Sequence, residues 1–208
     1  DCSRWPHDPP LSAGGQEQAR EIGKKLYDKA VADNVIFDTV VCSPFFRCVQ
    51  TAVEICCKLE VSGTKPTLLL DNSLGEVYGP STLGDEKPLM ATRPLQDILD
   101  LCERTGVHCL AARKVFSAWP IWPEDLRSAR LRIQWSFVRY LLRSNESQRS
   151  FVMVTHADGV AASLSILPWC REFHVDKVEF GGMFVGSRSQ LEHTSVGEQE
   201  VGWQVIAE

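Results

Sequence analysis

The chain has 208 residues, of which 44% are hydrophobic and 24% charged, with a formal net charge of −5 at pH 7. This composition is typical of a soluble globular protein, and the length suffices for one domain with a full core. The acidic balance argues against nucleic acid or an anionic membrane surface as a partner, and no apolar run is long enough to span a membrane.

The eight cysteines show no C-x-x-C spacing, so the sequence contains no recognisable zinc motif. Cys42 follows Val40 and Val41 in an apolar run, where a free thiol behaves as a small hydrophobe. We therefore predict a reducing, cytoplasmic location and no metal or cofactor. An even number of cysteines is also compatible with disulfides.

Strand-like and helical segments alternate along the chain. Three short apolar runs predict buried strands, at residues 36–42, 67–70 and 150–155. The predicted helices run from Ser12 to about Val31, from Pro44 through Leu59, from Pro94 to Arg104, from Glu124 to Arg143 and from about 158 to 166. This alternation predicts an α/β fold with a mostly parallel central sheet and helices on both faces.

The remaining segments give weaker signals. Residues 71–93 form a long loop rich in Gly, Pro, Ser and Asp, and such a loop inside a domain is more often functional than idle. Alternation near the end of the chain predicts antiparallel strands at the sheet's edge, over residues 175–180, 183–187 and 201–206. The apolar residues of the helix 124–143 predict its buried side, namely Leu126, Leu131, Trp135, Val138 and Leu142.

His156 stands at the junction between the predicted strand 150–155 and the helix that follows. Ligands of open α/β sheets bind beyond the carboxyl ends of the strands, and a helix N-terminus there favours an anion such as phosphate. His156 is therefore a candidate phosphate contact, although a histidine that merely caps the helix would leave the same pattern.

Two further residues could complete such a site. Arg47 follows the strand 36–42 in the first turn of a predicted helix, and a guanidinium suits a phosphoryl group. Glu76 lies in the loop 71–93, where it could protonate a leaving alkoxide with a pKa raised by burial and a nearby dianion. Considered singly, each is more simply explained as a surface residue.

Four motifs in one order change that interpretation. The segment Pro10–Ala19 resembles the pattern PLT-x-x-G-x-x-Q-A, and Ser43–Ala52 resembles SP-x-x-R-x-x-Q-T-A. Both patterns belong to the histidine phosphatase superfamily, the phosphoglycerate mutase-like proteins. Leu74-Gly75-Glu76 resembles that family's acid loop, and Val154-Thr155-His156 resembles the segment with its second pocket histidine.

The resemblance implies a phosphoglycerate mutase-like fold and a mechanism. In that family, the histidine of an Arg-His-Gly motif attacks phosphorus and becomes a phosphohistidine, in a pocket of two arginines and two histidines. By this resemblance Arg47 and His156 are pocket members, and Glu76 is the candidate acid. The expected ligand is a phosphorylated substrate or inorganic phosphate, and no metal is needed. Which substrate, and whether phosphatase or mutase chemistry follows, stays open.

The 208 residues contain no Arg-His-Gly. His7 is the nearest histidine to the expected place, but it lacks a following glycine and a preceding strand. We expect a single histidine-phosphatase-like domain, residues 1–208, that lacks its first strand. Either the sequence is part of a phosphatase whose nucleophile lies upstream, or the chain is an inactive pseudophosphatase that serves as a scaffold or complex subunit with a protein partner. The presence of Arg47, Glu76 and His156 favours the enzyme.

Overall fold

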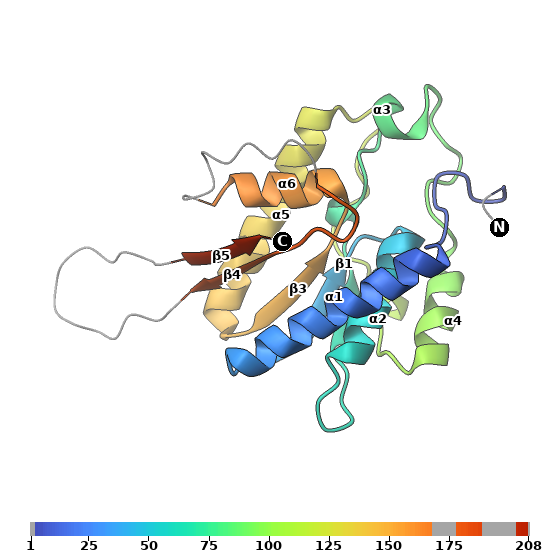
Figure 1. Ribbon diagram of the computed structural model, residues 1–208. Coiled ribbons are helices and arrows are strands. Elements are labelled where there is room, and N and C mark those ends of the chain that lie inside the picture. Colours follow the sequence, from blue (N-terminus) through green and yellow to red (C-terminus); the bar gives the residue numbers. More distant parts are fainter. Residues whose placement is uncertain (1–2, 168–177, 189–202, 208) are drawn as a thin grey trace, which may run out of the picture.

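The computed structural model describes residues 3–167, 178–188 and 203–207. Its centre is a parallel sheet with the strand order β2–β1–β3, formed by Phe37–Cys42 (β1), Thr67–Leu70 (β2) and Ser150–Val154 (β3). Cys42 of β1 is in register with Leu70 of β2 and with Val154 of β3. The carboxyl ends of the three strands therefore lie at the same end of the sheet (Figure 1). The predicted strands and their parallel arrangement are confirmed.

Helices precede and follow these strands as predicted, except that a short helix, Pro80–Leu83, lies in the segment 71–93, which was predicted to be a loop. They are α1 (Ala13–Ala32), α2 (Phe46–Lys58), α3 (Pro80–Leu83), α4 (Leu95–Thr105), α5 (Leu126–Ser147) and α6 (Ala157–Ser165), with 3₁₀ turns at Asn72–Leu74 and Leu110–Ala112. The Ser12 hydroxyl accepts a hydrogen bond from the Gly15 N–H at 3.1 Å, which confirms the predicted cap of α1. Pro44 was expected in the first turn of α2, but the helix begins at Phe46 with Phe45 as its N-cap.

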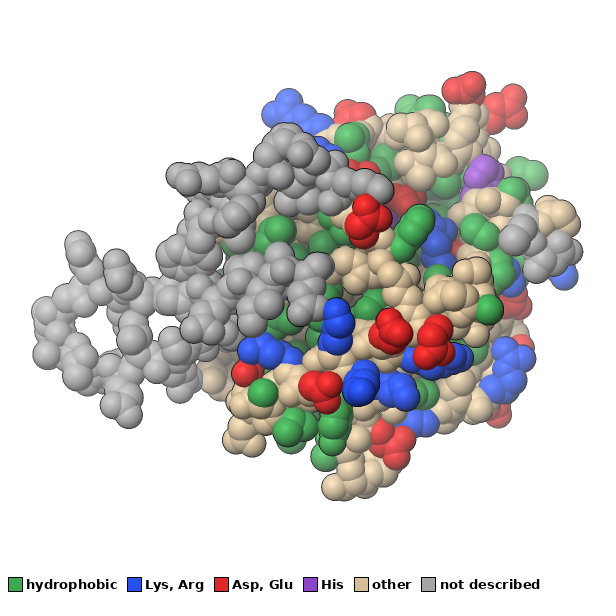
Figure 2. Space-filling view, in the orientation of Figure 1, with side chains coloured by type: hydrophobic (Ala, Val, Ile, Leu, Met, Phe, Trp, Pro, Cys, Tyr) green, Lys and Arg blue, Asp and Glu red, His purple; other side chains and the backbone are tan. Residues whose placement is uncertain are grey.

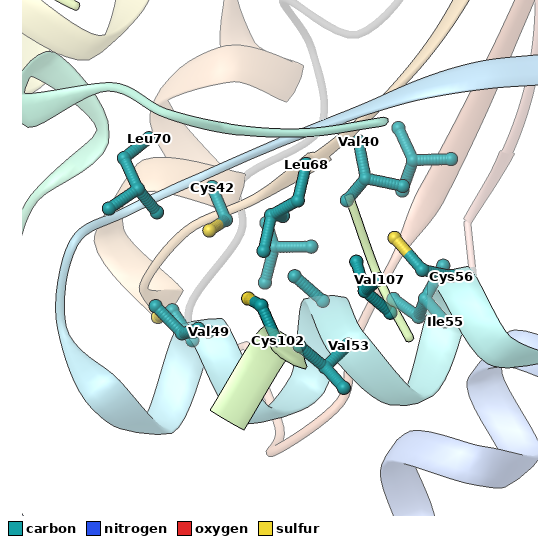
Figure 3. Packing of buried hydrophobic residues seen from close by; sticks show 14 of the residues in the cluster. Val40, Cys42, Val49, Val53, Ile55, Cys56, Leu68, Leu70, Cys102 and Val107 are labelled. Carbon is teal, nitrogen blue, oxygen red and sulfur yellow. The ribbon is translucent and has the colours of Figure 1, made fainter. Parts of the chain in front are cut away.

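The two faces of the sheet follow from the alternation of its side chains. Val40, Cys42 and Leu68 belong to the main core, where the apolar residues of α2 pack against them (Figure 3). The intervening residues, such as Val41, face the opposite way and pack with Tyr140 of α5. The sheet is therefore covered by helices on both faces, as the sequence predicts.

The prediction for the buried side of α5 was wrong. Its buried residues are Ala129, Ile133, Ser136 and Tyr140. The residues predicted to be buried include four that are exposed: Leu126 (39%), Leu131 (45%), Trp135 (73%) and Leu142 (59%). The physical reason is that the inner side of α5 contacts a polar loop as well as the sheet, so its buried positions include polar residues such as Ser136.

The C-terminal strands were predicted only in part. Phe184–Arg188 (β4) and Trp203–Ala207 (β5) pair in antiparallel fashion, but they form a two-stranded sheet of their own. Among the described residues they share no hydrogen-bonded ladder with β1–β3, so the expected place at that sheet's edge is wrong. Of the strand expected at 175–180, residues 175–177 lie outside the described residues. Residues 178–180 are not extended into a strand, because the chain turns at Gly181, whose φ is +80°.

The surface offers one further observation about the environment of the fold. Acidic and basic side chains are interspersed over the face on which α1 lies (Figure 2). Within residues 3–167, 178–188 and 203–207, no helix combines the length and apolar character that crossing a membrane requires.

Candidate active site

Arg47 and His156 come together because β1 and β3 are neighbours in the sheet. The N–H of Ser43, just after β1, donates to the carbonyl of Val154 at 2.9 Å, so the two strands end side by side. Arg47 lies in the first turn of α2 and His156 is the N-cap of α6. The arginine Nη2 is 3.1 Å from the histidine Nδ1.

Glu76 approaches the same place from the loop 71–93. Its Oε2 is 3.0 Å from Nδ1 of His156 and 3.2 Å from Nη2 of Arg47. Since a carboxylate only accepts, we assign the Nδ1 proton and the arginine proton as donated to this one oxygen. The three residues predicted from the sequence are therefore mutually within hydrogen-bond distance.

Ser43 and Phe45 fix the histidine ring, and neither was singled out for this role. Nε2 of His156 is 2.9 Å from the Ser43 hydroxyl, and the Phe45 ring meets the imidazole edge-on at 5.1 Å. Burial of His156 opposes its charge, but Cys48 and Glu76 beside it raise the pKa of the ring to about 9. The imidazole is therefore positively charged at neutral pH, with a donor on each ring nitrogen.

The expected rise in the pKa of Glu76 was wrong. Burial acts to raise the pKa, but the hydrogen bond and charge of His156, the Val77 N–H and the charge of Arg47 lower it to about 2. The prediction assumed a neighbouring dianion, and here the carboxylate is instead surrounded by positive charge. Glu76 is thus ionised, and its carboxylate is the anion that the two cations hold.

Asp8 is a second buried carboxylate that the sequence reasoning missed. It is 1% exposed and accepts from the Phe46 N–H at 2.7 Å and from the Arg93 N–H at 2.9 Å. Its Oδ1 is also 3.8 Å from Nη1 of Arg47. Burial raises the pKa of Asp8, while these N–H groups and the arginine charges oppose the rise. Asp8 therefore caps the N-terminus of α2 and lies near Nη1 of Arg47, whereas Glu76 contacts Nη2.

His7 contacts this site through its backbone, because its carbonyl accepts from Nη1 of Arg47 at 3.3 Å. An aromatic group lies next to the site as well. Trp119 stacks on Phe45 with ring centroids 6.2 Å apart, and Tyr78 meets Trp119 edge-on at 5.6 Å. Arg47 lies over the Phe45 ring at 4.7 Å, so the aromatic group also supports the guanidinium.

Comparison with known proteins gives a family and a fold. No curated protein matches the sequence. The family model described as "Histidine phosphatase superfamily (branch 1)" matches residues 3–91. That segment contains Asp8, Arg47 and Glu76, and it ends before His156.

Solved structures share the fold at low sequence identity. An ecdysone phosphate phosphatase from Bombix mori, solved in complex with tungstate, is 16% identical with a TM-score of 0.63, covering 98% of this chain and 73% of that chain. A mycobacterial glucosyl-3-phosphoglycerate phosphatase, solved with VO3, is 20% identical with a TM-score of 0.51, covering 96% of this chain and 86% of that chain. The match to "Mycobacterial hydrolase 1" has 18% identity, the same coverage of both chains, and a TM-score of 0.52.

The family match and the shared fold confirm the resemblance that the four ordered motifs indicate: residues 3–91 are similar to branch 1 of the histidine phosphatase superfamily, and the chain shares its fold with solved phosphatases.

Proposed function

We propose that the chain is the phosphate-binding part of a cytoplasmic phosphatase that hydrolyses a phosphomonoester. Arg47 and His156 bind the phosphoryl oxygens, and Glu76 protonates the leaving group. The observation that carries this proposal is the meeting of these three side chains, from three separate segments, within 3.2 Å of one another. Two cationic donors can stabilise the charge of a phosphoryl group in transfer, and one carboxyl group can protonate the leaving oxygen from which it departs.

The ion contacts of Glu76 suggest how substrate binding prepares the acid. Its carboxylate accepts from both Arg47 and His156, so it uses the donors that a phosphoryl group would need. A phosphoryl dianion that takes over these donors removes the interactions that lower the pKa of Glu76, and adds a negative charge nearby. Both changes raise its pKa from about 2, toward the range in which Glu76 can donate a proton to the leaving group.

The nucleophile in this proposal is a histidine outside the 208 residues. Its nitrogen attacks phosphorus, the bond to the leaving oxygen breaks, and Glu76 gives that oxygen its proton. Water then cleaves the phosphohistidine and releases phosphate. Both edges of β1 are occupied, by β2 and β3, whereas within the described residues β3 pairs with β1 alone. A strand that brings this histidine to the site would therefore pair with the other edge of β3.

Phosphate binding tests the site without requiring turnover. Calorimetric titration of the 208-residue chain with phosphate or vanadate should detect binding that Arg47→Ala and His156→Ala each weaken by about 10–100-fold, the effect of one charge-assisted hydrogen bond. The exposed residues Arg127 and His108 provide matched controls, and Arg127→Ala and His108→Ala should bind as the parent does. Equal affinity in all four folded variants would contradict the proposal.

Activity tests the chemistry and the alternative function. The 208-residue chain should not hydrolyse phosphomonoesters. A longer chain that carries Arg-His-Gly should form an acid-labile, base-stable phosphohistidine. In that enzyme Glu76→Gln should slow alkyl phosphates more than p-nitrophenyl phosphate, whose leaving group needs little protonation. A natural upstream sequence without Arg-His-Gly would instead favour the inactive scaffold with a protein partner.

A further inference from the structure

One side of α5 is polar and contacts the acid loop, which we define as residues 71–79. The contacting side chains are spaced four, three and one residues apart, which places them on a single side of the helix, and they are Arg132, Ser136, Arg139 and Tyr140. The acid loop carries Glu76, so this side of α5 lies behind the candidate acid.

Arg132 makes the most contacts with the loop. Its Nη1 donates to the carbonyls of Ser73 at 2.8 Å and Gly75 at 3.2 Å, and its Nη2 donates to the carbonyl of Glu76 itself at 3.1 Å. The guanidinium thereby holds three backbone carbonyls over four residues. Such a planar arrangement of donors is available to arginine but not to lysine.

Glu124 orients the guanidinium from the other side. Its two carboxylate oxygens accept from Nε of Arg132 at 2.7 Å and from Nη2 at 2.8 Å, and the side chains are only 7% and 15% exposed. The same carboxylate accepts from the Tyr78 N–H at 3.0 Å. Glu124 also packs so closely on Gly79 that any side chain at residue 79 would collide with its backbone. Arg132 and Glu124 therefore contact the acid loop at residues on both sides of Glu76.

The beginning of the loop is held independently. Asp71 is fully buried and accepts from the Tyr140 hydroxyl at 2.8 Å and from Nη2 of Arg139 at 2.9 Å. The Thr155 hydroxyl, one residue before His156, donates to the Leu74 carbonyl at 2.7 Å. With the start of the loop already fixed, Arg132 is left to determine the backbone position at Gly75 and Glu76.

We propose that Arg132, oriented by Glu124, is a positioning residue for Glu76. It touches neither Arg47 nor His156 in the contacts described, and it acts by fixing the backbone from which the Glu76 carboxylate reaches them. The inference rests on the proposed function in one respect, since Glu76 matters for catalysis only if it is the acid. The geometry itself does not depend on that role.

The test measures the titration of His156, because its pKa of about 9 depends in part on where Glu76 stands. The groups that face the ring are Glu76, Arg47, Cys48 and Ser43. NMR titration of the imidazole in Glu76→Gln should show a pKa closer to its ordinary value of about 6.5. Arg132→Gln and Arg132→Lys should shift it in the same direction, and combining either with Glu76→Gln should produce no further shift.

Exposed Arg127, on the same helix, supplies the control. In the Arg127→Gln variant, His156 should titrate with the same pKa as in the parent. If Arg132→Gln does not fold, Arg132→Lys keeps the charge while losing the planar contacts, and Glu124→Gln weakens the pair from the other side. A folded Arg132→Lys or Glu124→Gln chain with the parental His156 titration would overturn the inference. The inference would also be overturned if the His156 pKa shift caused by an Arg132 variant added fully to the shift caused by Glu76→Gln.

Failure of the proposed function gives a different result. If the chain binds no phosphate, the calorimetric titration is flat for every variant, while the His156 shifts still report whether Arg132 positions Glu76. If phosphate binds but the Arg132 variants leave the pKa of His156 unchanged, the phosphate site is supported and only the positioning role of Arg132 is contradicted.

Discussion

Helices α2 and α5 both carry apolar residues at helical spacing, yet of the two only α2 buries most of them. Val49, Val53 and Cys56 of α2 are buried against the sheet. On α5 four of the apolar residues predicted to be buried are exposed, Leu131 and Trp135 among them. Similar sequence patterns have therefore led to opposite packing.

The difference lies in what each helix packs against. The side chains of β1 and β2 that face α2 are apolar, so the most apolar side of that helix is the favourable one to bury (Figure 3). Part of the surface that faces α5 is the backbone of the acid loop, whose carbonyl groups must be paired when buried. Arg132 and Ser136 meet that need, and leucine could not. Periodicity thus identifies the buried side of a helix that packs on a sheet, but not the buried side of a helix that packs in part on a polar loop.

The largest expected effect comes from breaking the polar contact of α5. Glu124→Ala removes the carboxylate that pairs with Arg132 and leaves a poorly exposed guanidinium without its counter-charge. Loss of one partner of a buried pair costs about 3–5 kcal/mol, measurable by urea denaturation. The exposed pair Arg130–Asp158 is the control, and Asp158→Ala should cost less than about 1 kcal/mol. Equal costs for the two variants would show that the polar contact is not what holds α5.

The apolar contact of α2 should give the next largest effect. Ile55 is 2% exposed in the main core, and Ile55→Ala removes buried methyl groups and leaves a cavity. The expected loss is about 2–5 kcal/mol of unfolding free energy. Thermal denaturation of Ile55→Val, with an expected loss of about 0.5–1.5 kcal/mol, checks that the cost follows the volume removed.

How much the sequence predicts follows from the same contrast. The strands, the long helices, and Arg47, Glu76 and His156 were found because each lies in a local pattern of periodicity or motif. Asp8, Arg132 and Glu124 were not found, because their partners lie far away in the sequence, as Phe46 lies 38 residues from Asp8. The signal that was available was the spacing of Arg132, Ser136, Arg139 and Tyr140, which places polar side chains on one side of α5.

The pH dependence of stability should report the candidate site as a third, smaller effect. The raised pKa of His156, about 9, gives stability that is fully present below about pH 6.5 and is lost as the pH rises through about 9. The lowered pKa of Glu76, about 2, gives stability that is present above about pH 4.5 and is lost as the pH falls through about 2. The two shifts describe one ion pair, so its contribution should be greatest between about pH 4.5 and 6.5.

Glu76→Gln provides the comparison for this pH dependence. Melting temperatures of the parent and the variant, measured across the pH range, should differ most between about pH 4.5 and 6.5 and converge toward the extremes. A difference that stays constant up to pH 10 would mean that the ring of His156 is not held charged by Glu76.

The smallest expected effect concerns the exposed apolar side of α5. Trp135 is 73% exposed, so Trp135→Gln should change the free energy of unfolding by no more than about 0.5 kcal/mol. A helix that buried this residue, as its sequence pattern suggests, would lose about 3–5 kcal/mol on truncation to alanine, so Trp135→Ala separates the two packings clearly. Denaturation at two protein concentrations completes the test, because a contact between molecules would make any loss depend on concentration. A large loss that is independent of concentration would show that α5 packs through its apolar side after all, and would remove the basis for the role given to Arg132.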